Sequence, residues 1–212
     1  SGTVLAVNGQ IVTNVVLSAA NAYIEDSTVT TLDGGDVIVE ALNTSGLDAT
    51  ILAATSTGDT GVGITLAFNT IGWESQNFLF NTVDALLGDP LVADAFGNEQ
   101  PAQVQAYIRD SNVDAAGDLT LTAINQAHIN ATVSNAAESA ASALFGASGK
   151  SVGGIISSNK VSSAARAFIE YTGTPGTVSA DGSMAILAED RAGIFASSKV
   201  VSSSITTNNG GA

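Results

Sequence analysis

Few residues of this chain have the type and spacing that catalysis requires. The single histidine, His128, lies outside any HxxxH or HExxH pattern, and the chain has no cysteine to share a zinc site with it. A serine–histidine–aspartate triad would have to use this one histidine. The sequence therefore predicts a packed or surface histidine in a protein that is not an enzyme, with no catalytic residues.

Aspartates in glycine-containing turns are the only candidates for a metal site. They are Asp33, Asp36, Asp118 and Asp181. Calcium takes several carboxylate and carbonyl oxygens, but the GGxGxDxUx nonapeptide of calcium-binding repeats is missing. Asp and Gly also favour turns for conformational reasons of their own. We interpret these aspartates as turn residues and expect no cofactor, with calcium as the alternative.

Aromatic residues are concentrated between residues 73 and 105, where a ligand could bind. The candidate binding residues are Trp73, Phe78, Phe80 and Phe96. Apolar residues at 80, 83, 86 and 87, followed by Gly88, predict a short amphipathic helix or an ordered loop. Insertions in repeat proteins often project from one face and bind ligands. A flap that buries its own aromatic rings against the repeats is the other interpretation.

The overall composition limits the classes of partner. A net charge of −14 repels phosphate backbones and anionic lipid surfaces, so we expect neither nucleic acid binding nor membrane insertion. The hydrophobic fraction of 45% is sufficient for a continuous core. Small and β-branched residues dominate, which favours β structure over helix.

The structural elements that would position these residues are indicated by repeated blocks of sequence. AYIEDSTV at 22–29 returns as AYIRDSNV at 106–113 and, less closely, as AFIEYTGT at 167–174. Upstream, a shift of 145 places Asn14 on Asn159 and a separate shift of 55 places it on Asn69. The three asparagines thus occupy one repeat position, where we expect their amides to satisfy backbone groups of neighbouring layers in a turn. Downstream, alternating segments follow at 34–42, 116–124 and 181–189, which is the period of β-strands.

Internal repeats built from short strands predict an all-β parallel β-solenoid, in which equivalent residues stack in columns. The general rule for parallel crossovers makes a right-handed β-helix the expected form. Successive strands begin roughly 12 to 15 residues apart, so we expect each repeat to contribute several coils. Small alanines should allow opposite sheets to approach closely. The predicted inward residues are Ile24, Val37, Val39, Ile51, Ile108, Leu119, Leu121, Ile129, Val133, Ile169, Met184, Ile186 and Ile194.

The repeats divide one predicted domain, 1–212. Its parts are the end of a repeat at 7–21, a repeat at 22–105 with an insertion at 73–105, a repeat at 106–166 and a partial repeat at 167–212. The alanine-rich stretch 133–149 predicts a wider loop with a helical turn, opposite a polar turn in 51–61. Neither end carries a recognisable cap, which leaves strand edges exposed. We therefore expect neighbouring repeats, or copies of the chain stacked end to end, as partners.

The blocks AYIxDSxV, GDVxVxA and SNKVSSAARAFIEYTG resemble the β-strand repeats of very large exported bacterial proteins of the adhesin or haemagglutinin-like type. The resemblance implies an extracellular, elongated stalk or fibre segment at the bacterial cell surface, in a biofilm or in a filament, and provides no catalytic residues. An adhesion module that binds surface glycans through residues 73–100 is the alternative function. A polysaccharide-degrading enzyme is a third hypothesis, which glycan assays would test.

Overall fold

The computed structural model describes residues 5–73, 99–143 and 148–208, and these residues form fifteen strands in three successive coils. The first coil consists of β1 (Leu5–Val16), β2 (Ala19–Glu25), β3 (Thr28–Thr30), β4 (Val37–Asn43) and β5 (Gly46–Thr57). The second consists of β6 (Thr60–Ile71), β7 (Ala102–Arg109), β8 (Asn112–Ala115), β9 (Leu119–Asn125) and β10 (His128–Ala143). The third consists of β11 (Lys150–Val161), β12 (Ser163–Glu170), β13 (Val178–Ala180), β14 (Met184–Asp190) and β15 (Gly193–Asn208).

Each coil contributes one strand to each of five parallel three-stranded sheets. The second coil always provides the central strand, as in β1-β6-β11 and β2-β7-β12. Asn14 pairs with Asn69, which pairs with Asn159, so the register matches the alignment of the repeats. The predicted parallel β-solenoid with stacked repeats is therefore confirmed.

The expectation that each repeat contributes several coils is wrong. Successive strands of one repeat lie in different sheets, and each strand finds its hydrogen-bonded partners in the neighbouring repeat. Leu5, for example, pairs with Thr60, which pairs with Lys150. The interval of roughly 12 to 15 residues between successive strands separates the corners of one wide coil. It does not separate one layer of the stack from the next.

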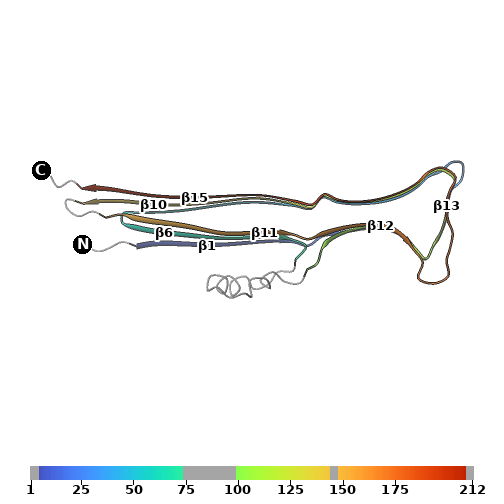
Figure 1. The fold of residues 1–212 in the computed structure, drawn as a ribbon, viewed down its shortest axis with the longest axis horizontal. Helices are drawn as coiled ribbons and strands as arrows, with labels where there is room; N and C mark the ends of the chain where they lie inside the picture. The colour runs from blue at the N-terminus through green and yellow to red at the C-terminus, as the bar shows by residue number, and fades with distance from the viewer. Residues whose placement is uncertain (1–4, 74–98, 144–147, 209–212) are drawn as a thin grey trace.

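The coils are long, narrow loops that nearly overlap in Figure 1. In the half that contains the chain ends, the sheet of β1, β6 and β11 lies opposite the sheet of β5, β10 and β15. In the other half, β2, β7 and β12 lie opposite β4, β9 and β14, and β13 with its sheet closes the narrow end. The stack is only three strands deep, so two of the three coils are outermost.

The apolar core fills the space between opposite sheets. One cluster contains Val37, Ile108, Leu119 and Leu121, with Ile24 and Ile169 packed against it. Two more clusters contain Ile51, Ile129 and Val133. These predicted inward residues are therefore buried or half-buried. The exceptions are Met184, Ile186 and Ile194 of the third coil, which pair with buried residues of the second coil but are 47%, 48% and 48% exposed.

Strand β10 contradicts the loop predicted for 133–149. Residues 133–143 belong to β10, and residues 51–57 of the predicted polar turn belong to β5. Strands β5 and β15 flank β10 in register. Its inward row contains small residues such as Ala137 and Ser139, both buried. A Cβ on Gly63 of β6 would lie 2.7 Å from Oδ1 of Asn135. Opposite sheets are thus close here, and pairing on both edges overrides the helical preference of alanine.

The insertion is described only at its two ends. Residue 73 and residues 99–101 belong to it, whereas Ala102–Gln105 already form part of β7. The helix or loop predicted for the remainder lies outside the described residues, as do 144–147 of the predicted wide loop. The part of the chain that is described contains no helix long and apolar enough to span a membrane.

Candidate functional site on the outward face of β2, β7 and β12

Three aromatic rings stack along the outward face of one sheet. Tyr23 and Tyr107 have ring centroids 5.2 Å apart with an interplanar angle of 10°, and Tyr107 and Phe168 follow at 5.1 Å and 7°. They come from equivalent positions of β2, β7 and β12. The spacing follows from parallel, in-register strands, which place identical positions directly over one another.

A column of charged residues lies two positions further along the same strands. Arg109 of the middle coil forms an ion pair with Glu25 at 3.1 Å and another with Glu170 at 3.3 Å. Its guanidinium carbon also lies 4.8 Å from the centroid of the Tyr107 ring. The hydrogen bond to Glu25 is the main cause that raises the pKa of Arg109 above its usual value. Charge therefore alternates from coil to coil as Glu, Arg and Glu.

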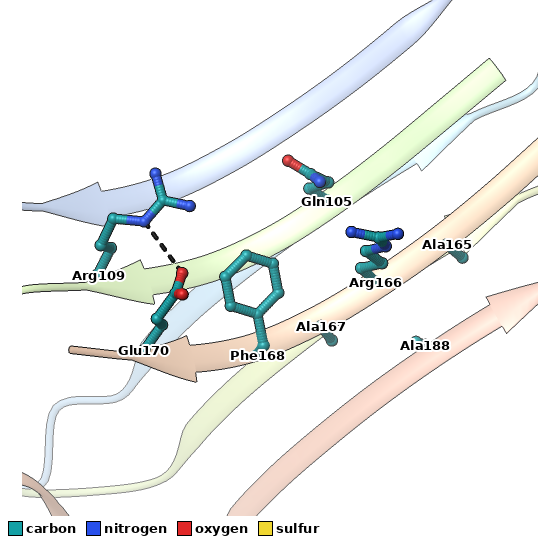
Figure 2. A pocket seen from close by; sticks show the side chains of 8 residues that line it. All are labelled: Gln105, Arg109, Ala165, Arg166, Ala167, Phe168, Glu170 and Ala188. Atoms are coloured by element: carbon teal, nitrogen blue, oxygen red, sulfur yellow. Dashed lines mark hydrogen bonds and ion pairs between the residues drawn. The ribbon is translucent and has the colours of Figure 1, made fainter. Parts of the chain in front are cut away.

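A hollow of about 690 Å³ opens beside this column, along the edge of β12 that has no partner strand among the described residues. Gln105, Arg109, Arg166, Phe168 and Glu170 contribute to its lining, with three alanines. Figure 2 shows the Arg109–Glu170 pair bridging two strands, with the Phe168 ring between Glu170 and Arg166. The lining combines charged, amide and aromatic groups without a histidine or a hydroxyl nucleophile. Such a surface is suited to recognition.

Two of the four turn aspartates, Asp36 and Asp118, accept hydrogen bonds from the backbone of the next coil. Oδ1 of Asp36 accepts a 2.7 Å hydrogen bond from the backbone N–H of Asp118, and Oδ1 of Asp118 accepts one of 2.7 Å from Ser183. Asp33 occupies a left-handed turn with φ 55°. Asp181 donates its N–H to the carbonyl of Ala115. Within the described residues, no group of three or more histidine, aspartate or glutamate side chains could hold a metal ion.

His128 contacts a backbone carbonyl and a glycine. It is exposed at the start of β10, and its Nδ1 lies 3.3 Å from the carbonyl oxygen of Gln126. The ring lies over Gly46, where a Cβ would be only 2.6 Å from the imidazole. This agrees with the surface histidine that the sequence predicts.

The base of the insertion is held by one backbone bridge and two side-chain contacts. Trp73 pairs with Glu99 in an antiparallel bridge, and the carboxylate of Glu99 accepts a 2.5 Å hydrogen bond from Ser162. The ammonium of Lys160 lies 3.1 Å from the centroid of the Trp73 ring. Trp73 is thus engaged with the solenoid. The other candidate binding residues, Phe78, Phe80 and Phe96, lie outside the described residues.

The repeated asparagines form a ladder of side-chain amides. Nδ2 of Asn14 donates to Oδ1 of Asn69, and Nδ2 of Asn69 donates to Oδ1 of Asn159, both at 2.8 Å. The expected bonds to backbone groups in a turn are therefore wrong, because these residues lie inside β1, β6 and β11. In-register pairing brings the amides so close that they satisfy one another.

The Glu25–Arg109–Glu170 column was not predicted from the sequence. Its signal is present in the aligned blocks AYIEDS, AYIRDS and AFIEYT, where the fourth letter alternates in charge while the first and third letters stay the same. Comparison of the chain with protein-family models, curated proteins and solved structures gives no match.

Proposed function

We propose that this chain is a structural, non-catalytic module of a longer β-solenoid, within an extracellular fibre, stalk or large repetitive adhesin at a bacterial cell surface. The supporting observation is the open third coil. Met184 and Ile186 are about half exposed, whereas their column neighbours Leu119 and Leu121 in the second coil are fully buried. A further coil would bury this apolar row and pair the free edges of the third coil.

The cross-section suits a load-bearing role. Each of the five sheets is bonded in register through all three coils, and side-chain ladders run parallel to the stacking direction. Adding coils would lengthen the module without any change of cross-section. In this proposal the function is to be long, stiff and resistant to proteases, and it requires no cofactor.

The alternative is an adhesion module that binds surface glycans through residues 73–100. It is favoured by the anchored base of the insertion, where Trp73 and Glu99 are fixed to the third coil through Lys160 and Ser162. Binding residues are often carried by loops that a rigid scaffold positions.

Deletion of residues 73–100 separates the two functions. The deletion joins Gly72 to Pro101 and leaves a two-residue link between β6 and β7, as Leu17 and Ser18 provide between β1 and β2. We expect the variant to keep its β-type circular dichroism and its resistance to limited proteolysis. Glycan-array and cell-adhesion binding that is present in the full chain and lost on deletion would establish the adhesion function. Absence of such binding in both proteins supports the structural role, and loss of β structure on deletion contradicts an autonomous solenoid scaffold.

A further inference from the structure

The charge column on β2, β7 and β12 gives both ends of the stack the same charge at this position. Charges alternate as Glu25, Arg109 and Glu170, and three is an odd number, so both outer coils present a glutamate. In any continuation of the sheet, the next strand would lie about 4.8 Å beyond β12. Directly opposed side chains of like charge destabilise such a pair, and opposite charges stabilise it.

A second copy of the chain, docked in register on the third coil, would continue two of its side-chain columns. Tyr23 would continue the aromatic stack beyond Phe168 on this face, and Asn14 would extend the amide ladder beyond Asn159 in the sheet of β1, β6 and β11. Glu25, however, would then face Glu170, each of them already paired to its own Arg109. This mismatch opposes stacking of identical copies.

Arg166 sets a second requirement for any strand that docks beside β12. It lies on the same outward row of β12 as Phe168 and Glu170 and contributes to the hollow in Figure 2. Among the described residues it has no ion-pair partner. Its column neighbours are Gln105 and Asn21, so the first coil of a second copy would offer it only an amide.

We infer that the free edge of β12 docks a parallel β-solenoid strand with an acidic, an aromatic and a basic residue at successive outward positions. These residues would face Arg166, Phe168 and Glu170. The middle coil has two of the three features, with Tyr107 and Arg109 at the corresponding positions of β7. The inference rests on the proposed function and adds to it that the array is continued by a charge-matched coil, and not by the first coil of an identical copy.

Reversal of the whole column tests this charge rule while keeping the pairs inside the chain. The triple variant Glu25→Arg, Arg109→Glu, Glu170→Arg presents arginine at both ends. In a mixture of the variant with the wild-type chain, every end-to-end contact between unlike molecules joins arginine to glutamate. Sedimentation velocity at low salt should show that the mixture associates about tenfold more tightly than either protein alone, and added salt should reduce the gain.

Glu40→Arg is the matched control. It changes the net charge by the same two units, but Glu40 lies on the column of Thr122 and Leu187, which holds no opposing charge. A mixture of this variant with the wild type should associate no more tightly than the wild type alone. Circular dichroism checks that every variant retains β structure.

The outcomes separate the inference from the proposed function. Wild-type chains that associate as tightly as the mixture overturn the charge rule and leave the structural proposal intact. Equal gains from the triple variant and from Glu40→Arg also overturn it, because net charge would then explain the effect. If neither the single proteins nor their mixtures associate at any concentration, both the charge rule and stacking of this chain on itself are overturned.

Discussion

The second and third coils place equivalent side chains in very different surroundings. Leu121 and Ile186 occupy one column and pair directly, yet Leu121 is fully buried and Ile186 is 48% exposed. The first coil is also outermost, but Val39 in the same column is only 5% exposed. In this column the two ends of the stack therefore differ, and the third coil is the open one. Burial in this fold comes from the neighbouring coils as much as from the opposite sheet.

Alanine substitutions at two positions of this column should give the largest difference in the free energy of unfolding. Leu121→Ala should lower the free energy of unfolding by about 3 kcal/mol, because it leaves a cavity between two coils. Ile186→Ala should cost about 1 kcal/mol or less, because much of its side chain already contacts water. Urea unfolding followed by circular dichroism measures both. Equal costs would show that the third coil is covered in solution, for example by a second chain.

Two glycines with nearly the same positive φ extend the comparison to the corners of the coils. Gly72 and Gly34 have φ values of 77° and 78°. A Cβ at Gly34 would meet no atom within 4 Å, but at Gly72 it would lie 2.3 Å from the carbonyl oxygen of Ser162 in the third coil. Gly34→Ala should therefore cost about 1 kcal/mol for the left-handed conformation alone. Gly72→Ala should cost about 2 kcal/mol or more, since the neighbouring coil must move.

Thermal and urea unfolding of the two glycine variants provide the measurement. Each variant controls for the other, because the backbone penalty is common to both. Similar costs would mean that the base of the insertion yields without affecting the third coil, and that the contact with Ser162 is not tight.

The repeats allowed the architecture and the register to be predicted, since identical blocks in a parallel stack must lie over one another. Asn14, Asn69 and Asn159 were aligned correctly from the sequence alone. The size of a coil was not predictable from spacing, because corners within a coil and steps between coils both separate short strands. Strand β10 was missed beyond Val133, where alanine and serine hide the period of two. The exposure of the Ile186 side chain depends on whether another coil covers it, and no local sequence pattern encodes the number of stacked coils.

The smallest expected effect concerns a loop in which the third coil departs from the first two. Thr172 donates hydrogen bonds from its hydroxyl and its backbone N–H to the carboxylate of Asp110 in the second coil. Both hydrogen bonds lower the pKa of Asp110, and the bond from the hydroxyl is the larger cause. A lowered folded-state pKa contributes stability above the ordinary aspartate pKa of about 4, and this contribution is lost as the pH falls through the lowered value.

Thr172→Val removes the hydroxyl bond, so it should reduce stability slightly at neutral pH and have progressively less effect below about pH 4. Urea midpoints for wild type and variant between pH 2 and pH 7 measure the difference. Thr177→Val is the control in the same loop, because Thr177 bonds Asn112 through its backbone N–H, which valine retains. A Thr172→Val effect that is constant down to pH 2, or that Thr177→Val reproduces, would mean that the contact between these coils does not depend on the charge of Asp110. The contribution of this loop would then come from packing, as it does in the apolar columns.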